Sequence, residues 1–197
     1  MVINAPAALV KVEGMAIYNF ATSSGITING PANSAVNLGG LFLGLRANGA
    51  FASPGPNGAQ ERGLAAGSGV VQVGDGGARS MNVIAGNAAE GLLIGDGPPV
   101  GRTISVQGNL IGTAPDGTTA RANAIGISVN SNATIPGITI GGSTPALGNV
   151  IARNSGVGIN VQCALSSGTC LDGMQIIGNF IGTDVNNASI GNGGDGI

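Results

Sequence analysis

The sequence contains an internal repeat, and this repeat constrains the fold more than any other feature. The stretch "MNVIAGNAAEGLLI" that begins at Met81 matches "GNVIARNSGVGINV" that begins at Gly148, 67 residues later. The phrase "GNLIGTAPDGT" at Gly108 likewise returns as "GNFIGTDVNNA" at Gly178. Three blocks result, at residues 10–70, 71–137 and 138–197. Self-similarity at a long fixed period is typical of architectures that stack one structural unit.

Each block contains six short apolar segments and no amphipathic helix. The second block reads "VVQV", "NVIAGN", "GLLI", "TISV", "NLIGT" and "GISV", with Gly, Asn, Pro and Ser between the segments. Short runs of β-branched residues in alternation, bounded by turn formers, are typical of β-strands. No stretch combines a helical period with usable caps over two turns. The sequence therefore predicts an all-β chain.

Short, regular strands are compatible with a sandwich or a solenoid, and the repeat favours the solenoid. In a parallel coil, equivalent positions of successive turns stack, so the same residue types recur in register. Three strands per turn give six turns, two to each block, and a stack roughly 30 Å tall. A left-handed coil would show a strict six-residue period, which is absent. We predict a right-handed parallel β-helix that forms a single domain over residues 1–197.

Asparagines recur at matching places in the blocks. Asn87 and Asn154 fall in one column of the predicted stack, and Asn109 and Asn179 fall in another. Stacked asparagine side chains form amide ladders, and asparagine also tolerates left-handed backbone at corners. We interpret these residues as structural corners. In the phrase "GNLIGT", glycine would permit the bend and isoleucine would fill the core.

Composition excludes several classes of function. The chain has no histidine, so a Ser-His hydrolase and a zinc site with imidazole ligands are excluded. A Ser-Lys pair would need Lys11, the only lysine, on the first strand. The net charge is −2 and basic residues are scattered, which argues against nucleic acid as a partner. No apolar run approaches the roughly 18 residues of a membrane span.

Several phrases of the sequence resemble a known family. "GNLIGT", "GNFIGTD", "ITIGG", "GNVIARN" and "GNGGDGI" look like repeats of large bacterial surface and secreted proteins in the pectate-lyase-like β-helix superfamily. The resemblance implies a β-helix at the cell surface or outside the cell. It does not select a function, because the superfamily includes polysaccharide lyases and hydrolases, phage tailspikes and adhesins. The paired Asp, the His motif and the Arg-Ile-Lys triplet of its pectin hydrolases are absent, and no strand carries the paired carboxylates of its calcium-dependent lyases.

Long loops follow "LFLGL", "NLIGT" and "NFIGT", on every second turn and along one predicted edge of the solenoid. Solenoids commonly bind through the edge that accumulates insertions. Solvation of a sparsely charged coil is the alternative explanation for polar loops. The loops hold seven of the sixteen charged residues: Arg46, Glu61, Arg62, Asp116, Arg121, Asp184 and Asp195. Among these, Arg46, Arg121 and Asp195 are the candidate binding residues.

Asp116 and Asp184 are the candidates for a catalytic pair. They come from loops two turns apart, so their bases lie about 10 Å apart. Inverting glycosidases place their carboxyl groups roughly 6.5–9.5 Å apart, which loop tilt could reach. Calcium is a weaker candidate: Asp184, Asn186, Asn187 and Asp195 supply oxygen atoms, but their spacing fits no known calcium loop.

Cys163 and Cys170 bracket one insertion, "ALSSGT". Their spacing does not match metal or thioredoxin motifs. A local disulfide is expected, which would place the chain in an oxidising, extracytoplasmic setting, and free thiols are the alternative. Phe42 and Phe180 fall at strand positions and are expected in the core rather than in sugar stacking.

Two functional hypotheses follow. The first is a structural or adhesive module of a longer surface protein, displaying loops that bind a polysaccharide or a surface protein. The alternative is a carbohydrate-active hydrolase or lyase that uses carboxylates at the loop edge. Sparse, unclustered acidic residues favour the first. Because no cap is evident at "VINAPAALVKV" or at "GNGGDGI", we expect a fragment of a longer solenoid that self-associates through its ends.

Overall fold

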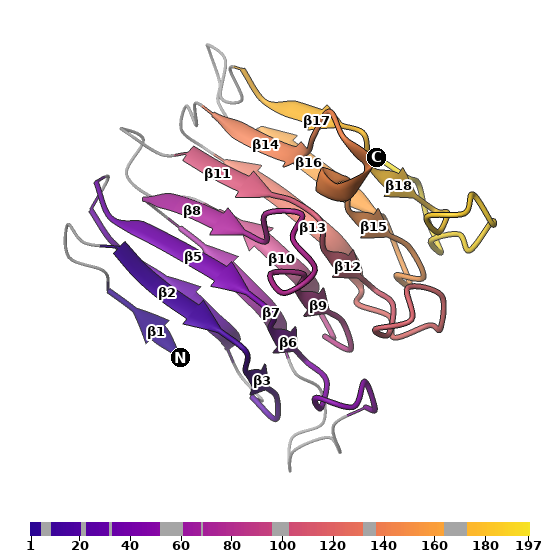
Figure 1. Cartoon of the computed structure of the whole chain (residues 1–197), viewed down its shortest axis with the longest axis horizontal. Coiled ribbons are helices and arrows are strands. Elements are labelled where there is room, and N and C mark those ends of the chain that lie inside the picture. Colours follow the sequence, from indigo (N-terminus) through magenta and orange to yellow (C-terminus); the bar gives the residue numbers. More distant parts are fainter. Residues whose placement is uncertain are drawn as a thin grey trace.

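The computed structural model describes residues 1–4, 9–20, 23–31, 33–51, 61–67, 69–95, 103–131, 137–163 and 173–197, without the side chains of Ser131 and Cys163. Within them, eighteen strands form three parallel sheets of six strands each. Each strand from β4 to β15 pairs with the strand three places earlier and the strand three places later in the chain, and the strands of the first and last turns pair on one side only. The chain is therefore a parallel β-helix of six turns with three strands per turn, as predicted (Figure 1).

The first sheet contains β1 (Val2–Ile3), β4 (Ser24–Ile28), β7 (Arg62–Ala66), β10 (Glu90–Ile94), β13 (Ile125–Ser131) and β16 (Ile159–Cys163). The second sheet contains β2 (Leu9–Glu13), β5 (Ala35–Gly39), β8 (Val70–Val73), β11 (Thr103–Val106), β14 (Ile138–Gly141) and β17 (Gln175–Ile177). The third sheet contains β3 (Ala16–Ile17), β6 (Phe42–Leu43), β9 (Val83–Ile84), β12 (Leu110–Ile111), β15 (Val150–Ile151) and β18 (Phe180–Ile181). The one helical element in the described part is a 3₁₀ turn, Pro145–Leu147, and no helix there could cross a membrane.

The core is a set of stacked aliphatic columns. In the third sheet, Ile111 pairs with Ile151, which pairs with Ile181, so the two isoleucines of the repeated phrase stack two turns apart as predicted. Ile111 is fully buried. Alternation along strands follows from the two-residue period of side-chain direction: in β8, Val71 and Val73 are buried while Gln72 faces outward.

Two asparagine ladders run along the stack, one where the chain enters the third sheet and one where it leaves that sheet. The first comprises Asn82, Asn109, Asn149 and Asn179, where the second sheet turns into the third. Its amides are linked from one turn to the next at 2.8–2.9 Å. The second comprises Asn87, Asn123, Asn154 and Asn192, where the third sheet turns into the first, with links of 2.8–3.0 Å. The amide ladders predicted in both columns are confirmed, and each contains more members than predicted.

The expectation of left-handed backbone at the ladder asparagines is wrong. Among the described residues, the non-glycine residues with positive φ are Asn19, Arg153 and Asn187, and none belongs to a ladder. The bend falls on neighbouring glycines, as predicted for the repeated phrase: Gly108 and Gly178, each before a ladder asparagine, have φ of 65° and 64°. Glycine takes this conformation without steric cost, which leaves the asparagine free to direct its amide along the stack.

A column of glycines stacks in the first sheet beside the second ladder: Gly63, Gly91, Gly126 and Gly158. A Cβ atom on Gly126 would lie 2.5 Å from the carbonyl oxygen of Gly158 and 2.9 Å from the amide nitrogen of Asn154. No side chain fits at that distance. This explains why "GLLI", "GISV" and "GINV" all begin with glycine.

Candidate functional site: the loop edge

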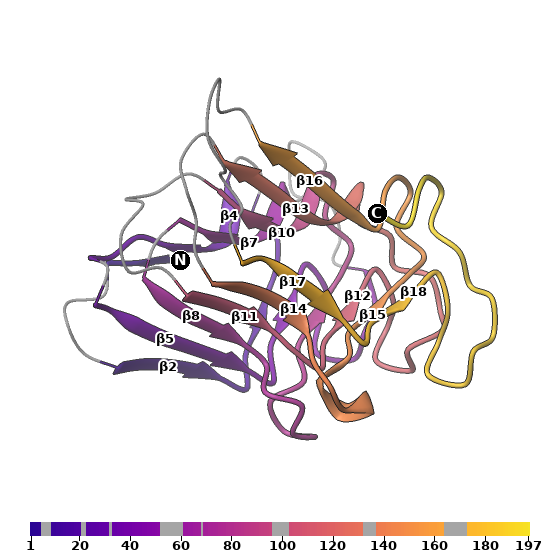
Figure 2. The same cartoon turned by 90° about the horizontal axis from the view of Figure 1, so that it is seen from above.

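Three long loops lie along one edge of the solenoid, which we call the loop edge. They span residues 44–51, 112–121 and 182–190, after β6, β12 and β18, and are numbered first to third below. An antiparallel bridge closes each loop at its base: Leu45 with Phe51, Thr113 with Ala120, and Thr183 with Ser189. Figures 1 and 2 show the loops side by side beyond the third sheet. They fall on the second, fourth and sixth turns, which is the alternation predicted from the sequence.

Asp116 shapes the second loop. Its Oδ1 atom accepts hydrogen bonds from the backbone N–H groups of Thr118 at 2.9 Å and Thr119 at 2.8 Å, and its Oδ2 atom accepts one from the Thr119 hydroxyl. The Thr119 hydroxyl, followed by the two backbone donors, lowers the pKa of Asp116 to about 2. A general acid in glycoside hydrolysis needs a raised pKa. Asp116 therefore lacks the protonation behaviour of that role.

Asp184 plays the same structural part in the third loop. Its Oδ1 atom accepts hydrogen bonds from the backbone N–H groups of Asn186 at 2.8 Å and Ala188 at 2.9 Å. Asp184 is only 5% exposed. No hydrogen bond or ion pair within the described part of the chain reaches its Oδ2 atom. This carboxylate therefore has one oxygen engaged in the loop and one available.

The structure brings the two candidate catalytic carboxylates to one cavity. Asp116 and Asp184 both line a space of about 230 Å³ between the second and third loops. Apolar side chains form most of the remaining lining: Met81, Leu110, Pro115, Val150 and Val185. The cavity thus combines an apolar surface with two carboxylates, and we call it the acidic cavity.

Arg121 fastens the first loop to the second. Its Nε donates to the carbonyl oxygen of Gly49 at 2.9 Å, and its guanidinium lies 4.8 Å from the centroid of the Phe51 ring. This distance is within the range of a cation–π contact. The same position of the third loop, directly after the bridge, is Ile190, which is buried. Arg121, predicted to bind a ligand, thus holds two loops together, while the second and third loops lack this link.

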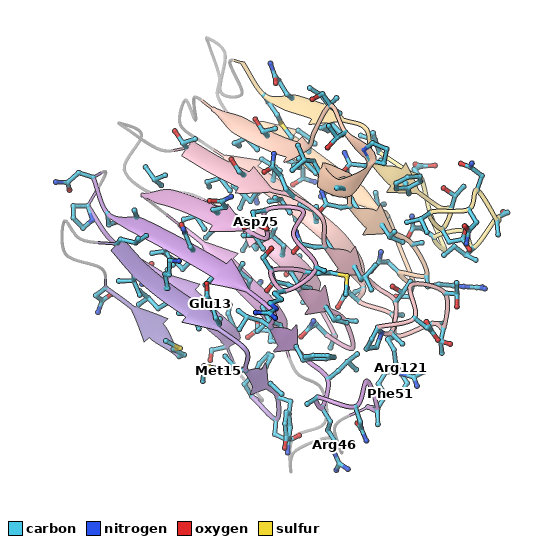
Figure 3. The ribbon with its side chains drawn as sticks, in the orientation of Figure 1. Glu13, Met15, Arg46, Phe51, Asp75 and Arg121 are labelled. Carbon is cyan, nitrogen blue, oxygen red and sulfur yellow. The ribbon has the colours of Figure 1, made fainter. Side chains whose placement is uncertain are left out.

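The remaining candidate binding residues lie apart from the acidic cavity. Arg46 is exposed on the first loop, points away from the body (Figure 3), and has no partner for its guanidinium among the described residues. Asp195 is exposed beyond the third loop, where its carbonyl oxygen accepts a hydrogen bond from the N–H of Gly158. Arg62 lies in β7 rather than in a loop, and its Nε donates to Oε2 of Glu90 on the neighbouring β10 at 2.6 Å.

A second apolar cluster, not predicted from the sequence, lies beneath the loops. The outward column of the third sheet is apolar, and the loops cover it: Phe42, Val83, Leu110, Val150 and Phe180. Phe42 and Phe180 do occupy strand positions, but they pack against this outer cluster and not the main core. Two consecutive apolar residues in each two-residue strand are the signal that could have revealed it.

A polar face was also missed. The outward column of the second sheet carries polar side chains on every turn: Lys11, Asn37, Gln72, Ser105, Thr139 and Gln175. At its corner, Glu13, Asp75 and Arg79 line an open depression of about 590 Å³ (Figure 3). The Ser80 hydroxyl and the N–H of Gly77 bond to Asp75 and lower its pKa. The residues of the column lie on successive turns, and Glu13 lies 62 positions before Asp75, so no local motif marks this face.

The proposed calcium ligands do not converge in the described residues. Oδ1 of Asp184 is engaged by backbone N–H groups, and Asp195 lies beyond the loop. Within the ranges that the structure describes, no three His, Cys, Asp or Glu side chains come together. The Cys163 side chain and Cys170 lie outside the described residues, so the disulfide stays a prediction.

Searches against protein-family models, curated proteins and solved structures found no match for this chain.

Proposed function

We propose that this chain is a structural or adhesive module of a bacterial extracellular or cell-surface β-helix protein, and that its loop edge binds glycan or protein. The observation that carries the proposal is that the loop carboxylates bond to the backbone of their own loops. Asp116 and Asp184 hold the backbone of their own loops, and Asp116 has a lowered pKa. Such loops present a preformed surface, which reduces the entropy cost of binding.

The β-helix supports this role mechanically. One ladder asparagine precedes and another follows the strand and loop of the fourth turn (Asn109 and Asn123) and of the sixth turn (Asn179 and Asn192), so the second and third loops are flanked by ladder hydrogen bonds. Arg121 adds a side-chain link between the first two loops. A rigid coil with anchored loops on one edge suits display and attachment, since loops already held in place lose less conformational freedom on binding.

The test combines binding and turnover on one panel of acidic and neutral polysaccharides. Affinity electrophoresis would measure retardation, and the same mixtures would be assayed for reducing sugar and for the absorbance of unsaturated products. We expect retardation by one or more polysaccharides without product. Arg46→Ala should weaken a protein or glycan contact at the loop edge, and Arg79→Ala, on the opposite corner of the third sheet, is the matched control. Turnover of any polysaccharide would overturn the non-catalytic part of the proposal.

The alternative is a carbohydrate-active hydrolase or lyase, and one observation favours it: Asp116 and Asp184 line the same cavity. In that case Asp116→Asn should abolish turnover while the melting temperature shifts by only a few degrees. Equal loss of activity and folded protein would instead mean that Asp116 acts through its loop.

A further inference from the structure

The loop edge carries groups of opposite charge at two separate places. The exposed Arg46 lies on the first loop, which leaves the second turn. The acidic cavity lies between the second and third loops, over the fifth turn. Within the described residues, neither the Arg46 guanidinium nor the Oδ2 atom of Asp184 has a partner. A desolvated carboxylate near an apolar surface favours a cationic neighbour.

The size and chemistry of the acidic cavity indicate an arginine side chain as its occupant. At about 230 Å³ it is smaller than the roughly 300–1,000 Å³ of small-molecule sites, so it accommodates a side chain better than a whole ligand. The apolar stem of arginine packs on surfaces such as Leu110 and Val185. Its planar guanidinium pairs with carboxylates, here Asp116 and Asp184.

Exposed apolar side chains accompany both partners of this contact. Phe51, at the base of the first loop, is 56% exposed, and Val185, on the wall of the acidic cavity, is 60% exposed. Aromatic and arginine anchors that fill pockets dominate the energetics of protein interfaces. The first loop therefore has the composition of an anchor, and the cavity has the composition of its receptor.

Within one chain, Arg46 and the acidic cavity lie on different turns and cannot contact each other. Two chains related by a two-fold axis can bring them together. An axis perpendicular to the solenoid, between the third and fourth turns, would place the second turn of one copy opposite the fifth turn of the other. Both contacts then form at once, as in any isologous interface. We propose that the loop edge is a self-association surface on which Arg46 of each copy enters the acidic cavity of the other. The product is a closed dimer in which the protein partner of the loop edge is a second copy of this chain, so this inference rests on the binding function proposed above.

The first test is sedimentation velocity over a concentration series, at low salt, with Arg46→Glu and the matched control Arg79→Glu. Arg79 is also exposed, but it lies at the corner between the second and third sheets. The wild-type protein should show a monomer–dimer equilibrium that weakens as salt is added. Arg46→Glu should raise the dissociation constant by about tenfold or more, while Arg79→Glu should leave it unchanged.

A charge-swap experiment makes the contact specific. In the Val185→Lys homodimer, the new cation beside the cavity repels Arg46 of the other copy. In the Arg46→Glu homodimer, the new carboxylate is repelled by Asp116 and Asp184 of the other copy. Mixed together, the two variants should form a heterodimer, because the introduced glutamate of one copy then faces the introduced lysine of the other, while the second contact stays native. A wild-type monomer at all concentrations, equal effects of the two arginine variants, or no heterodimer would each overturn the proposal. Species larger than a dimer, formed equally by the wild-type protein and Arg46→Glu, would also overturn the proposal and would indicate association through the solenoid ends.

Discussion

Asn82 and Asn109 are joined by two hydrogen bonds across 27 residues of sequence: Oδ1 of Asn109 accepts from the backbone N–H of Asn82 at 3.2 Å and from its side-chain amide at 2.8 Å. Both residues are buried. Each turn therefore provides the acceptor that satisfies the polar groups of the turn before it. The ladder couples the turns into one structure.

Replacing a ladder asparagine should be costly. Asn109→Ala would leave the backbone N–H of Asn82 without its acceptor and would leave the Asn82 amide only its bond to the Leu38 carbonyl oxygen, and each unsatisfied buried group costs about 1–3 kcal/mol. We expect a loss of about 3 kcal/mol in the free energy of unfolding, measured by urea denaturation. The control is Asn37→Ala, which faces outward on the second sheet and should change stability by less than about 0.5 kcal/mol. Equal effects of both variants would contradict the ladder.

The glycine column gives a second prediction. In Gly126→Ala the new Cβ would meet the carbonyl oxygen of Gly158 at 2.5 Å, so the stack must shift, at a cost of about 1–3 kcal/mol. Gly191→Ala is the control, because nothing lies within 4 Å of a Cβ atom there. Its stability should be unchanged or slightly higher, since alanine lowers the entropy of the unfolded chain. Thermal melts should show a lower melting temperature for Gly126→Ala only, and equal melting temperatures of the two variants would contradict the glycine column.

Truncating a side chain should destabilise the protein most in the buried column that the repeat defines. Ile111→Ala removes a fully buried side chain and should cost about 2–5 kcal/mol, and Ile111→Asp should prevent folding. Val70→Ala, at a position 41% exposed on the second sheet, should cost less than about 1 kcal/mol. Normal expression and an unchanged circular dichroism spectrum of Ile111→Asp would show that the register is wrong.

The titration of Asp116 can be followed directly by NMR of its carboxyl carbon. With a pKa of about 2 in the folded protein, below the usual value near 4 in an unfolded chain, the Asp116 carboxylate stabilises the fold above about pH 4. That contribution is lost as the pH falls from about 4 toward 2. Thr119→Ala removes the hydroxyl donor and should raise the pKa toward its usual value. A midpoint near 4 in the unmodified protein would rule out these bonds in solution.

The disulfide between Cys163 and Cys170 also remains open to a simple test. Alkylation without reductant, followed by intact mass, should show no modified cysteine. Closing so short a loop contributes about 2–3 kcal/mol, so reduction should loosen the insertion without unfolding the β-helix. Two alkylated cysteines would mean free thiols.

Sequence reasoning reached the fold because a parallel solenoid repeats its chemistry on every turn. Ile111 and Ile181, or Asn109 and Asn179, occupy equivalent positions, and the offset between them reports the stacking. The loop edge was located for the same reason, since the insertions recur on every second turn. The bend at the glycines of the repeated phrase was predicted correctly, but the backbone of the ladder asparagines was not: asparagine tolerates positive φ, and only the contacts between turns decide that it directs its amide along the stack instead.

The candidate site was less accessible because its properties arise from contacts between turns. Arg121 fastens the first loop through the Gly49 carbonyl, and Ile190 at the matching place does not, so one pair of loops is joined and the next encloses a cavity. Glu13 and Asp75 meet at a corner although 62 positions separate them in the chain. No local pattern of residues encodes such meetings.

The most direct test of the account is to titrate ¹⁵N-labelled protein with soluble galacturonate and glucose oligosaccharides while recording amide spectra, and then to recover the sugars for mass analysis. For the monomeric protein, in which no second copy covers the loop edge, the account predicts that shifts are confined to residues 44–51, 112–121 and 182–190 and that each oligosaccharide is recovered intact. Shifts centred on the polar face of the second sheet, or recovery of cleaved sugars, would contradict a non-catalytic binding role for the loop edge.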